Sequence, residues 1–144
     1  MPTAPRKLRT LIAGLGLTLA AVCGPAVAGD PAAVKKFQET RACVQCDLRY
    51  ESFPAQDLSG ADLTGAFLFG AGFAGSSLVN ARMESAIMIH ANLKLSDLSH
   101  ANLAKANLEE ADMYGATLRG ANLTFAKLDG ANLEAAEITD AVLV

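Results

Sequence analysis

Two cysteines separated by two residues, Cys43 and Cys46, have the clearest capacity for chemistry in this chain of 144 residues. A pair at this spacing can form a disulfide, exchange thiols with a substrate, bind a metal ion or attach haem. Haem attachment needs a histidine directly after the second cysteine, and Asp47 stands there. Two cysteines supply only half of a zinc site, and His90 and His100 lie far along the chain, so neither metal nor haem is predicted.

The sequence around the pair separates the two remaining roles. A thioredoxin-like redox site would have its first cysteine at a helix N-terminus. Here a helical segment comes before the pair and a repetitive segment comes after it. A disulfide that joins these two segments therefore fits the context better, and the redox role stays open as the alternative.

No other set of residues predicts catalysis. The sequence brings together no nucleophile, base and orienting acid, and it has no glycine-rich loop of the kind that holds phosphates. His90 and His100 fall at outward corners of the repeat, where we expect solvated surface residues. We therefore predict a protein that is not an enzyme and needs no cofactor.

The segment that must position these side chains is built on a repeat of five residues. From Leu58 to Leu143, every fifth residue is Leu, Phe, Met or Ile at all 18 positions, and Ala stands two residues earlier in 15 of the 18 units. In an α-helix five residues advance about 500°, so the leucines would spread around the helix. In a flat strand an odd spacing would alternate them between the two faces. Neither element alone explains the pattern.

Both objections disappear if each unit is a short extended piece followed by a corner. Four corners then close a coil of about 20 residues, and coils about 4.8 Å apart bond to one another as paired strands do. Glycines such as Gly60, Gly65 and Gly115 fall two residues after the central apolar residue, where a corner with positive φ suits them. Each inward Leu or Phe would contribute roughly 1.5 to 3 kcal/mol by burial, so the repeat itself forms the core.

Units such as Ala101-Asn102-Leu103 and Ala121-Asn122-Leu123 resemble the pentapeptide-repeat proteins. The resemblance covers about Cys46 to Val144. It implies an all-β fold, a right-handed quadrilateral β-helix, over residues 46–144. The many Asp and Asn residues before the central Leu are part of this repeat and need no catalytic explanation.

Two local features qualify the resemblance. Secreted proteins similar to this chain have two cysteines just ahead of the first repeats, which implies a disulfide between Cys43 and Cys46. The unit from Glu51 to Ala55 departs from the pattern, and Pro54 has no N–H for the ladder. We therefore expect regular coiling to begin only after Pro54.

The N-terminus has the organisation of a secretory signal peptide over residues 1–28. Three basic residues precede an apolar stretch at 11–22, and a small-x-small cleavage pattern ends at Ala28. The apolar stretch is short and rich in glycine, so a retained membrane anchor is the weaker alternative, and no membrane span is expected after cleavage. Lipid attachment at Cys23 is a further alternative, although Val22 is larger than that signal tolerates. We predict export, with the periplasm as the destination.

Cleavage would also change the charge of the chain. It removes three of the 12 basic residues and none of the 15 acidic ones, which leaves a net charge of about −6. A nucleic-acid surface is therefore not expected.

Residues 29–45 are expected to form a cap. Asp30 and Pro31 can begin a helix that runs to about Arg41, and this helix would cover the open end of the first coil.

Stacking the sequence at 20 residues places four large apolar side chains on one outward face. Phe67 and Ile87 share one column, and Phe69 and Ile89 share a second. Polar residues lie in the same columns on both sides of this group, as they do around many interaction sites. The patch predicts contact with another protein or self-association, unless the cap or the residues at 50–55 cover it.

The C-terminal residues predict a second contact surface. Val142, Leu143 and Val144 end the pattern without a polar cap. An uncovered coil edge favours end-to-end dimerisation, a mode that the family resemblance also implies.

Two functions from different classes remain. The first is an exported, non-enzymatic scaffold or protein-interaction module. The alternative, implied by the resemblance, is a DNA-mimicking inhibitor of a type II topoisomerase. Such a mimic would have to meet its target in the cytoplasm, and here the acidic residues are interleaved with basic ones such as Lys94 and Arg119.

Overall fold

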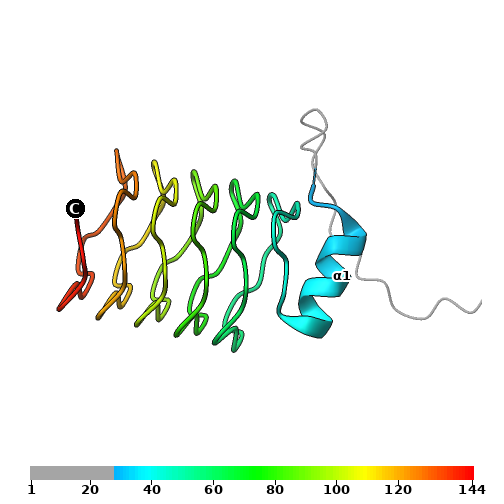
Figure 1. Ribbon diagram of the computed structural model, residues 1–144, viewed down its shortest axis with the longest axis horizontal. Helices are drawn as coiled ribbons and strands as arrows, with labels where there is room; N and C mark the ends of the chain where they lie inside the picture. The colour runs from blue at the N-terminus through cyan, green and yellow to red at the C-terminus, as the bar shows by residue number, and fades with distance from the viewer. Residues whose placement is uncertain (1–27) are drawn as a thin grey trace, which may run out of the picture.

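The structure, a computed structural model, describes residues 28–144 as one short helix followed by a stack of coils (Figure 1). Residues 1–27, which hold nearly all of the predicted signal peptide and Cys23, lie outside the described residues. Over the described stretch, no helix has the length and apolar character that a membrane span requires. Helix α1 spans Pro31–Thr40.

The coils repeat every 20 residues. Parallel bridges join each unit to the unit 20 residues later, from the pair Ala42 and Asp62 to the pair Asn122 and Val142. Since each unit has five residues, four units close one lap and give the coil four faces. The fold is the right-handed quadrilateral β-helix that the sequence predicts, and Figure 1 shows its laps side by side along one axis.

Hydrogen bonds explain why five residues make one stable unit. In the unit 62–66, the N–H of Asp62 bonds to the preceding coil, those of Leu63 and Gly65 bond to the following coil, and that of Ala66 closes a turn. The fifth N–H, on Thr64, is accepted by the carboxylate of Asp62 at 3.1 Å. Every backbone donor of the unit is therefore paired, as a stable β structure requires.

The core is the ladder of inward side chains. The central Leu, Met and Phe residues and the Ala two residues before them are fully buried through most of the stack. Two serines stand in place of Ala, and both are satisfied. Ser76 donates to the carbonyl of Phe53 at 2.5 Å and accepts from the N–H of Gln56 at 3.2 Å, while Ser96 donates to the carbonyl of Leu93 at 2.7 Å.

The expectation that regular coiling begins only after Pro54 is wrong. Bridges already start at Ala42, ahead of both Pro54 and the predicted start at Cys46. Pro54 is the residue just after the central Phe53, the one position of the unit whose N–H makes no backbone hydrogen bond. Proline fits there because it suits the second position of a turn and loses no hydrogen bond.

Helix α1 confirms the predicted N-terminal cap. The side chain of Asp30 accepts the N–H of Ala32 at 3.0 Å, Pro31 begins the helix, and Arg41 ends it in the left-handed region with φ of 55°. The ring of Phe37 is fully buried and packs edge-on against Phe53, with ring centroids 5.1 Å apart. The helix therefore closes the N-terminal end of the core, as Figure 1 shows.

Candidate interaction site

One face of the coil carries the predicted apolar patch. We call it face A; its outward residues form two columns, which are 47, 67, 87, 107, 127 and 49, 69, 89, 109, 129. Consecutive bridges join Asp47 to Phe67, Phe67 to Ile87 and Ile87 to Asn107, so residues 20 apart in sequence are direct neighbours. In the second column, hydrogen bonds of the neighbouring corner residues set the same register. The N–H of each corner residue bonds to the carbonyl of the column residue in the next coil, in the pairs Tyr50 and Phe69, Gly70 and Ile89, His90 and Glu109, and Glu110 and Asp129.

The patch itself consists of Phe67, Phe69, Ile87 and Ile89, and the structure brings all four together. Phe67 is 44% exposed, and the other three are partly exposed. Between positions 47 and 137, Phe67 and Ile87 are the only large apolar residues directly before a central residue. Where Asp or Asn stands at this position, its side chain accepts the N–H two residues later; Phe and Ile cannot do this.

An aromatic edge extends the patch along the corner of the coil. The ring of Tyr50 packs edge-on against Phe69 at 5.4 Å between centroids, and Phe69 packs against His90 at 5.2 Å. His90 in turn lies 3.4 Å from a carboxylate oxygen of Glu110. Tyr50 lies over Gly70, where a Cβ would come within 2.8 Å of its ring. Tyr50 therefore covers part of Phe69, but residues 50–55 form a regular unit and do not close over the patch.

Sequence reasoning missed His90 as a neighbour of the patch, because it treats this corner residue as solvated. It names residues 50–55 as a possible cover of the patch but does not identify the contact of Tyr50 with Phe69. The signal was available in the spacing, since Tyr50, Gly70 and His90 share one corner column at intervals of 20. The glycine between them leaves room for an aromatic ring.

A shallow open hollow of about 280 Å³ lies at the N-terminal side of the patch, lined by Gln45, Asp47, Arg49 and Phe67. The guanidinium of Arg49 makes two hydrogen bonds to the Asp47 carboxylate, at 2.6 and 2.9 Å. These bonds hold the pKa of Asp47 below its ordinary value, so the carboxylate stays charged at neutral pH. The hollow thus has one apolar wall and one internally paired polar wall.

The opposite side of the patch is also polar. Lys127 Nζ lies 3.6 Å from Glu109 Oε1, and Asn107 follows Ile87 in its column. Paired charges therefore border the apolar group at both ends. This is the arrangement of a desolvated centre with a hydrated rim that protein contacts commonly use.

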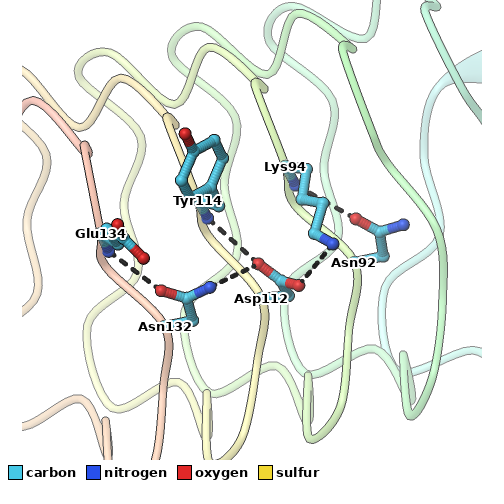
Figure 2. Close-up of polar contacts among 6 residues, drawn as sticks. All are labelled: Asn92, Lys94, Asp112, Tyr114, Asn132 and Glu134. Carbon is cyan, nitrogen blue, oxygen red and sulfur yellow. Dashed lines mark hydrogen bonds and ion pairs between the residues drawn. The ribbon is translucent and has the colours of Figure 1, made fainter.

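A second outward face shows the contrast, because its polar side chains bond to one another (Figure 2). Lys94 Nζ lies 2.8 Å from Asp112 Oδ2, and Asn132 Nδ2 donates to Asp112 Oδ1 at 3.2 Å. Asp112 also accepts the N–H of Tyr114, so its carboxylate has three partners. The hydrogen bond from Lys94 lowers the pKa of Asp112. These groups are satisfied within the fold and leave little for a ligand.

Comparison with known families classifies the repeat. The family model described as pentapeptide repeats matches residues 68–100 and 96–134, with eight copies. The chain belongs to the pentapeptide-repeat family. No curated protein matches the sequence.

Solved pentapeptide-repeat structures support the same conclusion. Rfr23 of the cyanobacterium Cyanothece 51142 is 26% identical, covers 78% of this chain and 98% of its own, and has a TM-score of 0.53. A pentapeptide-repeat protein of the Arabidopsis thaliana thylakoid lumen is 24% identical, covers 80% of this chain and 72% of its own, and has a TM-score of 0.54, which supports the fold alone. QnrB1, a plasmid-mediated fluoroquinolone resistance protein, is 17% identical over 68% of this chain and 65% of its own. Its TM-score of 0.30 is too low to support an inference about this chain.

The two cysteines lie where the helix meets the first pentapeptide coil. Cys43 is buried at a central inward position, Cys46 is partly buried at the following small position, and their Cα atoms are 5.3 Å apart. The two sulfur atoms are adjacent, which is the arrangement that a disulfide needs. The two cysteines lie where the predicted disulfide requires them, at the junction of the cap and the first coil, and the disulfide itself stays a prediction.

The predicted C-terminal contact site lies apart from face A. Val142, Leu143 and Val144 are 48%, 55% and 79% exposed at the C-terminal end of the described coil. His90 and His100 are exposed corner residues, as expected. In residues 28–144, no group of three or more His, Cys, Asp or Glu side chains is placed to hold a metal ion.

Proposed function

We propose that this pentapeptide-repeat protein is an exported, non-enzymatic scaffold that contacts another protein through the patch on face A. The observation that carries this proposal is the pair of adjacent coils in which Phe67 and Ile87 replace the Asp or Asn that the repeat favours. The replacement gives up a side-chain acceptor in two turns and exposes apolar surface. Gly72 and Arg82 also lack this acceptor, so the informative feature is the large apolar side chain at this outward position in two neighbouring coils, which contact with a partner explains best.

The rest of the surface supports the choice of face A. Apart from the C-terminal edge, no other group of large exposed apolar residues among the described residues matches this patch: Leu95 and Tyr114 are neighbours in adjoining coils, and Phe125 lies at another corner. Single exposed apolar residues are normal on protein surfaces, whereas a contiguous group bordered by charge is typical of a binding site.

The topoisomerase alternative receives no support from the charges. A DNA mimic needs an uncompensated run of negative charge along its length. Here acidic side chains on several faces pair with basic ones, including Asp62 with Arg82, Glu84 with Lys105 and Glu109 with Lys127. We therefore do not propose DNA mimicry for this chain.

Photo-crosslinking tests the proposed contact. A photoreactive amino acid is introduced at position 69 of the full-length chain in its producing cell, and a control chain has it at position 124 on another face. We expect position 69 to form a discrete crosslinked protein product and position 124 to form none. Equal labelling from both positions, or none from position 69, would contradict the patch as a contact surface.

Export is tested independently. We expect the processed protein in the periplasmic fraction, with an N-terminus at Gly29 by mass spectrometry and with Cys43 and Cys46 resistant to alkylation until a reductant is added. An unprocessed chain in the cytoplasm, with Cys43 and Cys46 both alkylated in the absence of a reductant, would rule out both the export and the disulfide.

We also propose the exposed C-terminal edge as a second contact, the end-to-end dimer that the sequence analysis predicts. Val142, Leu143 and Val144 offer apolar side chains there. Substitution Leu143→Ser should dissociate such a dimer in sedimentation velocity. An unchanged sedimentation coefficient in the variant would exclude this mode.

A further inference from the structure

Face A has a property that a patch for an unrelated partner does not need: its two columns are complementary to themselves when one copy is turned over. A two-fold axis that runs along the strand direction and passes between the coils of Leu68 and Met88 leaves each column opposite the same column of a second copy. It exchanges the coil of residue 67 with that of residue 87, and the coil of residue 47 with that of residue 107.

Resting on the proposed function of the patch, we propose that its partner is a second copy of this chain, docked face A on face A with the two coil axes antiparallel. The interface is isologous, so that every contact occurs twice.

The apolar contacts of this arrangement pair a large side chain with a smaller one throughout. Phe67 lies opposite Ile87 of the second copy, and Phe69 lies opposite Ile89 of the second copy. Each of the four contacts joins one Phe and one Ile, so the gap between the two sheets is uniform. Facing positions that alternate large and small residues pack well for this reason.

The charged contacts are complementary as well. Arg49 borders the patch on one side and Glu109 borders it on the other, each one coil away from the apolar group. Turning one copy over places Arg49 opposite Glu109 of the second copy, twice in the dimer. Asp47 lies opposite Asn107 of the second copy, which can donate a hydrogen bond to the carboxylate.

A parallel arrangement of the two axes fits less well. The two-fold axis would then exchange the columns, which places Phe67 opposite Phe69 of the second copy and Ile87 opposite Ile89 of the second copy. The sheets would be held apart at the Phe coil and would leave a void at the Ile coil. Glu109 would lie opposite Asn107 of the second copy and would gain no basic partner from it.

The size of the patch limits the strength of the dimer. Only two coils supply large apolar side chains, and specific stable contacts bury about 800 Å² on each partner. We therefore expect an interface at the small end of the range and a dimer that dissociates on dilution.

Sedimentation velocity over a range of concentrations tests the dimer with the purified, naturally processed protein. We expect the weight-average mass to rise with concentration for the wild-type chain, and the double variant Phe69→Ser/Ile89→Ser to weaken association at least tenfold. Leu95→Ser removes a more exposed apolar side chain that lies outside face A, and Leu143→Ser removes an apolar side chain of the C-terminal edge. Leu95→Ser should associate as the wild type does, and Leu143→Ser should still associate through face A even though it lacks the proposed end-to-end contact. Circular dichroism confirms that each variant keeps its fold.

A charge exchange tests the antiparallel geometry. Arg49→Glu and Glu109→Arg should each raise the dissociation constant roughly tenfold, because each creates two like-charge contacts in the dimer. The combination of both substitutions should restore affinity to within about threefold of the wild type, since opposite charges face each other again. Parallel docking predicts a different result, in which Glu109→Arg has little effect and the combination shows no rescue.

A monomer at all concentrations, a dimer lost only in Leu143→Ser, or a missing rescue would each overturn this proposal. The proposed function fails separately. If the chain stays monomeric but still crosslinks to another protein from position 69, only the dimer is contradicted. If position 69 forms no crosslinked product at all, neither with another protein nor with a second copy, both proposals are contradicted.

Discussion

At the scale of single residues, Asp and Asn before the central apolar residue work as turn acceptors. In ten units of the described chain, their Oδ1 accepts the N–H two residues later; these are Asp47, Asp57, Asp62, Asn92, Asp97, Asn102, Asn107, Asp112, Asn122 and Asn132. This N–H is the only one in the unit that is used neither by the ladder nor by the turn. The acidic and amide residues that are frequent in the sequence are therefore parts of the backbone hydrogen-bond system.

Asn102 offers a direct test of this role. It accepts the N–H of Ala104 at 3.2 Å and the side-chain amide of Asn122 at 3.2 Å. We expect Asn102→Ala to lower the free energy of unfolding by about 1 kcal/mol, because a partly buried donor loses its acceptor. Asn102→Asp keeps the acceptor oxygen and should cost much less. Urea titration measures both, and an equal loss in the two variants would contradict the role of the oxygen.

Asp112 predicts how stability depends on pH. Its pKa in the folded protein is lowered, first by the hydrogen bond from Lys94. A carboxyl with a lowered folded pKa stabilises the protein above its unfolded value of about 3.9, and this contribution disappears as pH falls through the folded pKa. Its side chain is 34% exposed, so we expect only about 0.5 kcal/mol.

The matched variant is Asp112→Asn, which keeps an oxygen for the N–H of Tyr114 and loses the charge. Between pH 6 and about pH 2.5, the urea midpoint of the wild type should fall further than that of the variant. If both midpoints fell by the same amount, the charge of Asp112 would have no part in acid sensitivity.

At the scale of elements, the helical cap and the corner turns decide where the coil can begin. Helix α1 buries Ala33 and Phe37 on the first coil, and Gly29 and Asp30 donate backbone hydrogen bonds to its edge at 2.9 and 3.0 Å. The N-terminal edge is thereby covered both by apolar side chains and by hydrogen bonds. Such a cap is needed because a bare strand edge recruits other strands.

Removing the Phe37 ring should expose the first coil. Phe37→Ala is expected to lower the free energy of unfolding by about 3 kcal/mol, as for other buried aromatic residues. Val34→Ala, at a half-buried position of the same helix, should cost less than half as much. Hydrogen exchange should show faster exchange in residues 42–58 of Phe37→Ala and little change after residue 80. Uniformly faster exchange would show that α1 is not a local cap.

The sequence predicted the elements unequally, for physical reasons. The inward ladder and the helix follow from spacing and capping residues, so both were found. The sequence misplaces the start of the coil because proline has no N–H to donate to the ladder. At the position of Pro54, however, the ladder uses no N–H. The contacts of Tyr50 with Phe69 depend on the direction of a corner side chain, which a five-residue pattern does not specify.

At the scale of the whole molecule, the coil is a one-dimensional stack in which each lap contacts only the laps beside it. Stability in such a stack is close to a sum of contributions from neighbouring laps. Inward residues of the middle laps are fully buried, whereas Leu128 and Leu133 in the last described lap are partly exposed. The same type of inward side chain therefore contributes different amounts to the free energy of unfolding in different laps.

Two equivalent substitutions measure this gradient. Leu103 is 0% exposed, and we expect Leu103→Ala to lower the free energy of unfolding by about 3 kcal/mol. Leu133→Ala should cost less than half as much, because the side chain is already partly hydrated. Urea unfolding followed by circular dichroism provides both values. Equal losses would mean that Leu133 is covered in solution, as it would be in an end-to-end dimer.

The closure of one lap by four equal units has a consequence for how such a chain can change its length. Loss of one unit would keep the inward order of small and large side chains, but it would turn every later unit by a quarter of a lap. If a unit between Ile89 and Glu109 were lost, the interior would stay filled while Glu109 moved from face A to an adjoining face. Insertions and deletions in steps of five residues can thus rearrange the outer chemistry of the rod while its interior is preserved.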